Sequence, residues 1–376
     1  MPEISQRAEL MPASPIRKLV PLAEAARSRG IRIYHLNIGQ PDLPSPQTGL
    51  AALKKIDRKV LEYSPSDGYR SLREKLAGYY QQYQIKLSPE EIIVTTGGSE
   101  AVLFAFMSCL NPGDEIIVPE PAYANYMAFA ISAGAVIRPV VSSIEQGFAL
   151  PDVAEFEKLI NERTRGILIC NPNNPTGSLA EPGTVAATLE ACSRVGAVLV
   201  VDECFLPFTD GPSCKGLLQE YPNLIVLRAF TKLYAMAGLR LGYLMTGDLS
   251  LLHAVAQQLP EWNVSSIAQR AGISALQDTE YEKRTRQLIE KERRYLIQEF
   301  LKMGCTVFPS EADYITFRLP QEKTGFLLKE RLLEGKILIR SCANYRNMPP
   351  DCYRIAVKQH ADNEELVRQV WRILIQ

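Results

Sequence analysis

The stretch GILICNPNNPTG, residues 166–177, joins a short apolar run to a loop that contains two Asn-Pro pairs. Residues that precede proline avoid the helical region, so we expect this loop to be rigid and non-helical. Similar apolar runs recur on both sides of it between positions 90 and 246. We expect each run to be a strand: IIVTT (92–96), EIIVP (115–119), AVIRPVV (135–141), GILIC (166–170), AVLVVD (197–202), LIVLRA (224–229) and GYLMT (242–246).

Segments whose apolar residues have helical spacing lie between these strands. They include EAVLFAFMSCL (100–110), DVAEFEKLI (152–160) and GTVAATLEACSRV (183–195). Strands made almost wholly of Val, Ile and Leu that alternate with helices are typical of a parallel sheet covered on both faces. We therefore predict an α/β fold with a mostly parallel central sheet and helices on both faces. A ligand is expected outside the carboxyl ends of its strands.

The two ends of the chain have a different character. A charged helix of about 25 residues is predicted at 278–303, and shorter strand and helix segments follow it. The first 45 residues are rich in proline and contain no convincing strand for the central sheet, so we expect them to pack on the C-terminal unit. The sequence thus predicts a large α/β domain at 46–265 and a smaller α+β domain formed by 1–45 with 266–376.

The composition excludes several classes of protein. The chain has 376 residues, of which 46% are hydrophobic, with 42 basic and 42 acidic side chains. This hydrophobic content is too high for a disordered chain, and the neutral charge provides no basic surface for nucleic acid or for an anionic membrane. We expect the partners to be small molecules and other copies of the same chain.

Histidine and cysteine usage narrows the chemistry and the location. The histidines, His35, His253 and His360, are far apart, so we expect neither a histidine-based metal site nor a Ser/His triad. The eight cysteines form no CxxC pair, and several lie in apolar runs, as reduced thiols do. No export signal is evident at the N-terminus, and no apolar run is long enough to span a membrane. These features predict a cytoplasmic protein.

Several groups that could hold a cofactor follow strands of the predicted sheet. TTGGSEA (95–101) opens a helix whose free N–H groups could bind a phosphate. Asp202 ends one strand, and Lys232 follows another among apolar neighbours, with Arg240 eight residues later. Taken singly, such features are more often a glycine turn, a helix cap and solvated cations. Together they predict a cofactor site in which a partly buried lysine acts as an amine nucleophile.

Pyridoxal phosphate can use all of these groups at once. It presents an aldehyde, a pyridine nitrogen, a phenolic oxygen, a ring face and a phosphate. The chain resembles the class I/II aminotransferases, which are fold type I pyridoxal phosphate enzymes, and their aspartate-aminotransferase-like branch most of all. The resemblance spans nearly the whole chain and rests on the order and spacing of LNIGQPD (36–42), NPTG (174–177), DE (202–203), TK (231–232), GLRLGY (238–243) and YRIAV (353–357).

The resemblance implies roles for residues around the cofactor ring. Lys232 would form the Schiff base with the cofactor and move the substrate proton, and Asp202 would pair with the pyridine nitrogen. Asn174 would hydrogen-bond the phenolic oxygen. Tyr123, in PAYANY, would stack on the ring face, although an aromatic residue in such a segment could also belong to the core.

The resemblance also implies groups for the two anions. The cofactor phosphate would be bound by the backbone N–H groups of Gly98, Ser99 and Glu100, by the Thr231 hydroxyl, by Arg240, and by Tyr63 of a neighbouring subunit. The substrate would be bound by Gly39, Asn174 and Arg354, with Arg354 as the bidentate clamp for the carboxylate. A Tyr63 that crosses a subunit boundary implies a two-fold symmetric homodimer with shared active sites.

Two residues depart from the family pattern. Phe205 lies three residues after the ring-binding Asp, where the family often has a tyrosine that supports the phenolic oxygen. Ala229 replaces a serine that binds phosphate in many members. Phosphate binding is therefore expected to depend more on Thr231, Arg240 and the helix start.

The resemblance implies an aminotransferase that exchanges amino groups between an L-amino acid and a 2-oxo acid in a ping-pong cycle. A histidinol-phosphate aminotransferase or a threonine-phosphate decarboxylase is the alternative, and a non-catalytic ligand-binding homologue is a remote one. No motif identifies a residue that reads the substrate side chain. Arg17, Lys18 and Arg346 are cationic candidates for that role, although no motif supports them and a surface charge is the commoner explanation for each.

Overall fold

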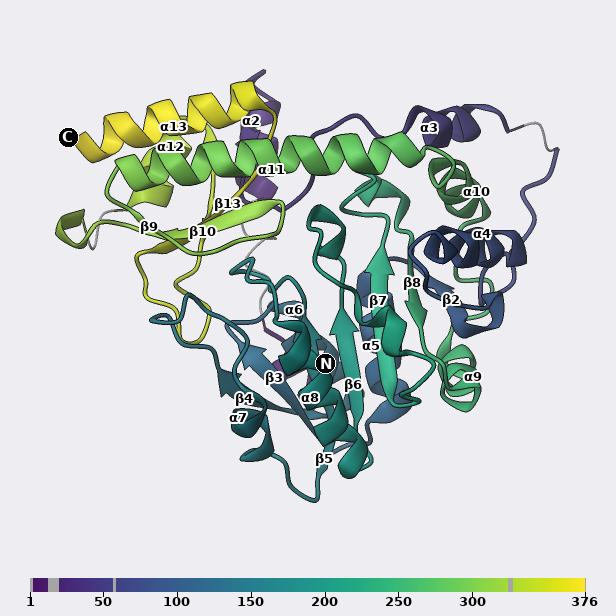
Figure 1. Ribbon diagram of the computed structural model, residues 1–376. Coiled ribbons are helices and arrows are strands. Elements are labelled where there is room, and N and C mark those ends of the chain that lie inside the picture. The colour runs from purple at the N-terminus through teal and green to yellow at the C-terminus, as the bar shows by residue number, and fades with distance from the viewer. Residues whose placement is uncertain (1–2, 13–19, 57–58, 324–326, 376) are drawn as a thin grey trace.

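The central element of the computed structural model is a seven-stranded sheet with the strand order β2-β8-β7-β6-β5-β3-β4 (Figure 1). The structure describes residues 3–12, 20–56, 59–323 and 327–375. The sheet is parallel except for β8, which runs antiparallel to both of its neighbours, so the predicted mostly parallel sheet is confirmed. Its strands are β2 (Ile92–Thr95), β3 (Glu115–Glu120), β4 (Val136–Val141), β5 (Thr164–Cys170), β6 (Val198–Asp202), β7 (Leu224–Ala229) and β8 (Gly242–Met245).

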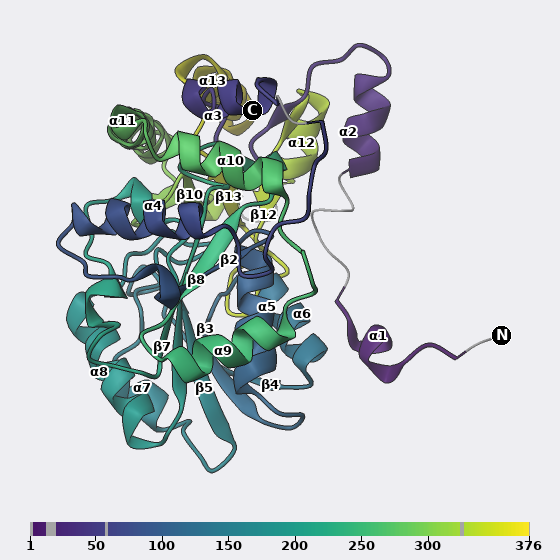
Figure 2. The ribbon, with the colours of Figure 1, turned by 90° about the vertical axis from the view of Figure 1, so that its right-hand side faces the viewer.

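Helices cover both faces of this sheet, and Figure 2 shows α5 and α6 on one side with α7 and α8 on the other. Alternate residues of β6 enter the two layers, because neighbouring side chains of a strand point in opposite directions. Leu199 and Val201 belong to the core layer that contains α8, whereas Val200 packs with α5 and α9. The covering helices are α4 (Arg70–Gln81), α5 (Gly98–Cys109), α6 (Asn125–Ala133), α7 (Val153–Glu157), α8 (Pro182–Arg194) and α9 (Leu249–Gln258).

A second unit lies above the carboxyl ends of the strands in Figure 1. It contains a four-stranded antiparallel sheet in the order β12-β13-β10-β9, with helices α11, α12 and α13 beside it. Its elements are β9 (Thr306–Val307), β10 (Tyr314–Arg318), α12 (Leu328–Glu334), β11 (Ile337–Leu338), β12 (Arg340–Ser341), β13 (Cys352–Ala356) and α13 (His360–Ile375). The antiparallel pairing of β12 with β13 brings Arg340 opposite Arg354.

The N-terminal segment joins this second unit through β1 (Tyr34–His35), which pairs in parallel with β11. A strand of two residues has no period that a sequence pattern could reveal. The division of the chain at positions 46 and 265 stays a prediction. The remaining helices are α1 (Gln6–Leu10), α2 (Val20–Arg27), α3 (Gln47–Lys54) and α10 (Ser266–Ala275), and α10 packs against α3 and α4.

The long charged helix is present as α11 (Thr279–Lys302), and it runs across the top of the molecule in Figure 1. The Asp278 side chain begins it by accepting a hydrogen bond from the Tyr281 N–H. Its buried residues include Ile289, Leu296 and Phe300, which recur at helical spacing on the face toward β10. Among the described residues, no helix is both long and apolar enough to span a lipid bilayer.

Candidate active site

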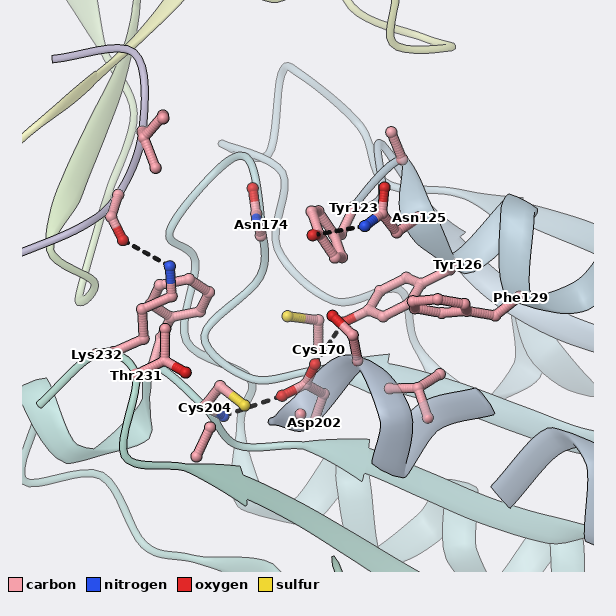
Figure 3. Close-up of a pocket in the computed structure, with 18 of the residues that line it drawn as sticks. Tyr123, Asn125, Tyr126, Phe129, Cys170, Asn174, Asp202, Cys204, Thr231 and Lys232 are labelled. Carbon is pink, nitrogen blue, oxygen red and sulfur yellow. Dashed lines mark hydrogen bonds between the residues drawn. The ribbon is translucent and has the colours of Figure 1, made fainter. Parts of the chain in front are cut away.

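A cavity of about 250 Å³ opens where the carboxyl ends of β5, β6 and β7 meet the N-terminus of α5 (Figure 3). The edge of the sheet provides Asn174, Asp202 and Lys232, and the second unit provides Arg354. The structure therefore brings together residues that are far apart in the chain, such as Asn174 and Arg354, which are separated by 180 positions. The cavity lies where parallel sheets bind their ligands.

Lys232 lies in the turn that follows β7. Its Nζ donates a hydrogen bond of 2.6 Å to the carbonyl oxygen of Gly39 and lies 5.0 Å from the ring centre of Phe205. Burial lowers the pKa of Lys232, and Arg354 lowers it further, whereas Asp313 opposes them. A lysine with a lowered pKa has more of the neutral amine that can act as a nucleophile and as a base.

Asp202 is the last residue of β6, and both of its carboxylate oxygens accept hydrogen bonds. Oδ2 accepts one from the Tyr126 hydroxyl at 2.9 Å, and Oδ1 accepts one from the Cys204 N–H at 3.0 Å. These bonds hold the carboxylate in one orientation. An ionised carboxylate at this position can pair with a protonated ring nitrogen. The sequence did not identify Tyr126 as a partner of Asp202.

The start of α5 has the free backbone N–H groups that an anion-binding site needs. Gly97 precedes the helix with φ of 87°, and no side chain caps the first N–H groups. A Cβ atom at Gly97 would lie 2.7 Å from Nη2 of Arg240, so only glycine lets this guanidinium lie against the helix start. Gly98, Ser99, Thr231 and Arg240 line the cavity, which agrees with a phosphate-binding role.

Glu100 supports the helix start from outside the cavity. Its carboxylate accepts hydrogen bonds from the Thr96 N–H at 2.6 Å and from the Asn263 side chain at 3.0 Å. The side chain of Glu100 thus fixes the turn that precedes α5, and a phosphate contact could come only from its backbone N–H.

Arg354 and Asn174 form one hydrogen-bonded unit. Nη1 of Arg354 donates to Oδ1 of Asn174 at 2.6 Å, and Nη2 donates to the Asn37 carbonyl at 3.0 Å. This arrangement fixes the Asn174 amide so that its Nδ2 remains as a donor toward the cavity. Nε of Arg354 is buried without a hydrogen-bond partner among the described residues, so the guanidinium retains a donor for a ligand.

Tyr123 lines the cavity, whereas Tyr63 does not. The Tyr123 hydroxyl accepts a hydrogen bond of 2.9 Å from Asn125, its ring packs edge-on against Tyr126, and burial raises its pKa to about 12. Tyr63 is 77% exposed and stacks on Trp262 with ring centres 4.7 Å apart. An exposed Tyr63 outside the cavity of its own subunit agrees with a role at a neighbouring subunit, which stays a prediction.

Arg340 was missed by the sequence analysis. It lines the cavity beside Arg354, its Nη2 donates to Asn344 at 2.7 Å, and its guanidinium lies 5.0 Å from the ring centre of Tyr345. A charged residue directly after the apolar run ILI (337–339) was the only signal available. Arg340 and Arg354 together give one end of the cavity two positive charges.

Asp313 is a further residue that the sequence did not identify, and it lies behind the cavity wall. It is 1% exposed, and neither carboxylate oxygen has a hydrogen-bond partner among the described residues. Its Oδ1 lies 3.3 Å from the position that a Cβ on Gly39 would occupy. Burial raises the pKa of Asp313, while Lys232, Lys358 and Arg354 oppose this rise. The carboxyl group therefore shares a buried electrostatic environment with the nucleophile.

These groups fit pyridoxal phosphate. The uncapped start of α5 with Arg240 suits a phosphate, Asp202 suits a pyridinium nitrogen, and the free Asn174 amide suits a phenolic oxygen. Lys232 is within the same cavity and has a pKa lowered by burial. The fold and the site define a pyridoxal-phosphate-dependent enzyme.

Comparison with known proteins specifies the family. Residues 31–370 match the family described as Aminotransferase class I and II. A histidinol-phosphate aminotransferase 2 of Carboxydothermus hydrogenoformans is 31% identical over 334 residues, which cover 88% of each chain. A threonine-phosphate decarboxylase of Salmonella typhimurium is 33% identical and covers 84% of each chain. The crystal structure of aspartate aminotransferase from Thermotoga maritima superposes with a TM-score of 0.89 at 25% identity, covering 99% of this chain and 100% of that one.

The chain belongs to the class I and II aminotransferase family and is a pyridoxal-phosphate-dependent aminotransferase. The predicted family, fold class and cofactor are thereby confirmed. Of the cationic candidates for reading the substrate, Arg17 and Lys18 lie outside the described residues, and the Arg346 side chain is 60% exposed.

Proposed function

We propose that this enzyme transfers the amino group of an L-amino acid to a 2-oxo acid in a ping-pong cycle at the cavity described above. The observation that carries the proposal is the grouping of Lys232, Asp202, Asn174 and Arg354 around one cavity. An exchange of two substrates at one site needs a single anion clamp that both can use, because each carries a carboxylate next to the reacting carbon. Arg354 supplies that clamp.

The geometry supports a role for each of these residues. When bound, the cofactor supplies an electron-withdrawing ring that acidifies the substrate α-carbon. The Asp202 carboxylate, held by Tyr126 and the Cys204 N–H, maintains positive charge on the ring nitrogen. Lys232 Nζ takes the α-proton, because its lowered pKa leaves it partly neutral. Phe205 lies 5.0 Å from this amine and packs edge-on against Tyr314 at 5.1 Å, so the amine has an apolar neighbour on that side.

A second candidate function is favoured by Arg340. Arg340 on β12 and Arg354 on β13 lie opposite each other, and together they can bind a dianionic group. A substrate with a single carboxylate would need only one of them. Such a pair suits a substrate that carries a phosphate. The similarity to a histidinol-phosphate aminotransferase and to a threonine-phosphate decarboxylase supports this alternative equally well.

We also propose that the enzyme is a two-fold symmetric homodimer in the cytoplasm. The exposed Tyr63 and Trp262, with Leu61 at 56% exposure beside them, form an apolar surface that a second subunit could cover. All eight cysteines are free, which suits a reducing compartment.

Visible absorbance of the cofactor-loaded protein tests the proposal. We expect a band near about 420 nm or about 360 nm that changes when a substrate donates its amino group. The panel should contain common L-amino acids, histidinol phosphate and O-phospho-L-threonine, with carbon dioxide release measured in parallel. Conversion to the aminated cofactor without carbon dioxide identifies an aminotransferase, whereas stoichiometric carbon dioxide identifies a decarboxylase. A protein that stays colourless with added cofactor would contradict both.

A further inference from the structure

A second cavity, of about 420 Å³, adjoins the active site. The two cavities share Tyr123, Ala124, Asn125, Tyr126, Phe129 and Tyr345 in their walls. Most of the remaining wall is apolar and includes Val118, Met127 and Ile137. A group bound at Lys232 could therefore extend past Tyr123 or Tyr345 into a chamber that would accept methylene or aromatic groups.

Glu120 provides the buried charge of this second cavity. It is the last residue of β3 and is 7% exposed. Its Oε2 is buried without a hydrogen-bond partner among the described residues, and its Oε1 lies 3.7 Å from Nη1 of Arg346, beyond hydrogen-bond distance. Burial raises the pKa of Glu120, while Arg346 opposes this rise. Burial of a carboxylate that lacks a hydrogen-bond donor costs free energy. A ligand that donates a hydrogen bond to Glu120 would reduce that cost.

The other charge on the cavity wall offsets the charge of Glu120 only weakly. Of the described residues that line the cavity, Glu120 and Arg346 are the charged ones. The Arg346 side chain is 60% exposed, so water solvates its guanidinium, whereas Glu120 is shielded. The buried end of the chamber is thus negative, opposite in sign to the Arg340 and Arg354 end of the active site.

We propose that the second cavity is the subsite for the substrate side chain and that Glu120 selects side chains ending in a protonated amine, a guanidinium or an imidazole N–H. The proposal rests on the proposed function, since it concerns the donor substrate of the same site. Tyr345 lies between the two ends, because its ring contacts Arg340 and also lines the second cavity. A substrate would then have its anionic group at the arginines and its hydrogen-bond donor at Glu120.

The test compares amino acids that differ only at the distal end. Single-turnover amine transfer to the loaded enzyme is measured with L-lysine against L-norleucine and with L-histidine against L-phenylalanine. We expect the wild-type enzyme to prefer the donor-bearing member of at least one pair by about tenfold or more. Glu120→Gln should reduce that preference about tenfold and leave the rate with the neutral member within about twofold.

Three variants separate selection by Glu120 from a structural effect. Glu120→Asp retains the charge and should recover part of the preference. Glu115→Gln makes the same change at the other end of β3, where Glu115 pairs with Arg163 at 2.6 Å, and should leave the preference unchanged. Arg346→Gln should leave the preference intact or increase it, since it removes the cation that competes for Glu120.

Two results would overturn the proposal. One is a wild-type enzyme that prefers the donor-bearing member of neither pair, and the other is a preference that survives Glu120→Gln. Calorimetric titration of the apoprotein with the same four amino acids compares their binding affinities without turnover. If the enzyme transfers no amine, the proposed function is wrong. The subsite is then tested separately by whether Glu120→Gln selectively weakens binding of L-lysine or L-histidine.

Discussion

Phe205 lies against the nucleophile, with its ring centre 5.0 Å from Lys232 Nζ and its edge against Tyr314. A phenylalanine at this position contributes packing but no hydrogen bond, whereas a tyrosine would offer a donor to the phenolic oxygen of the cofactor. A donor stabilises an oxyanion and lowers the pH at which the chromophore loses its proton.

We expect the visible band of the loaded wild-type enzyme to titrate at a higher pH than that of Phe205→Tyr. An absorbance titration of both proteins measures this difference. Phe205→Leu, which also lacks a hydroxyl, should titrate close to the wild type. A band that titrates at an equal or lower pH in the wild type than in Phe205→Tyr would contradict the role assigned to position 205.

Asp313 acts on Lys232 through its charge. The negative charge raises the pKa of Lys232, in opposition to burial and to Arg354. Asp313→Asn removes that charge, so the Lys232 amine should lose its proton at a lower pH than in the wild type. Labelling of Lys232 in the apoprotein by an amine reagent, followed by mass spectrometry across a pH series, measures this directly.

The control for this measurement is Asp351→Asn, because Asp351 is a buried carboxylate that pairs with Arg318 at 2.8 Å and is not among the charges that shift Lys232. An Asp313→Asn profile that coincides with the wild type or moves to higher pH would refute the coupling. Because burial raises the pKa of Asp313, its ionised form opposes folding above that pKa. Asp313→Asn should therefore also raise the melting temperature near neutral pH, with the difference lost in acid.

At the scale of elements, the start of α5 depends on three glycines that come from two segments. A Cβ at Gly242 would lie 2.5 Å from the backbone carbon of Gly97, one at Gly97 would meet Arg240, and one at Gly98 would lie 3.0 Å from Sγ of Cys204. The close approach of β8 to this turn places Arg240 at the first N–H groups of the helix. The expected phosphate site therefore depends on how β8 packs against the start of α5. The residue types in the turn alone would not produce it.

Gly97→Ala should weaken cofactor binding about tenfold or more, because it strains a positive φ and displaces Arg240. Titration of the apoprotein with pyridoxal phosphate, followed by absorbance, gives the dissociation constant. Gly183→Ala is the matched control, since nothing lies within 4 Å of its added Cβ on α8 and its φ is not positive. Unchanged cofactor affinity in Gly97→Ala would show that the helix start does not hold the phosphate.

The strand ends that carry Asn174, Asp202 and Lys232 were predictable because β5, β6 and β7 are continuous apolar runs bounded by polar residues. The antiparallel direction of β8 was not predictable, since a buried strand has the same composition in either direction. Tyr126, Arg340, Asp313 and Glu120 were missed for a related reason. Their neighbours come from distant segments of the chain, as when the Asp313 carboxylate lies against Gly39. The local sequence around each residue does not reveal such contacts.

At the scale of the whole molecule, the site is built between the large sheet and the second unit. Carbonyl groups of the segment 37–40 accept hydrogen bonds from Arg354, Lys232 and Lys358, which come from both parts of the chain. Motif order along the chain predicted this assembly in outline, because the family resemblance spans both parts. The arrangement of subunits depends on contacts between chains, and Tyr63 is the residue through which it can be tested.

A mixture of two defective subunits tests whether active sites are shared. If the protein forms the proposed homodimer, the Lys232→Ala and Tyr63→Ala variants should each be impaired. Subunit exchange should create hybrids in which one site has both native residues, and a random mixture should recover up to about one quarter of wild-type activity. Activity that never exceeds the mean of the two separate proteins would show that Tyr63 does not serve the neighbouring site.

We expect Lys232 to be the residue that holds pyridoxal phosphate through a covalent linkage. Reduction of the loaded enzyme with borohydride, followed by peptide mass spectrometry, makes that linkage permanent and locates it. We predict a single pyridoxyl phosphate adduct on the peptide that contains Lys232, and none after Lys232→Ala. An adduct on another lysine, or a loaded enzyme that yields no adduct at all, would contradict this role of Lys232.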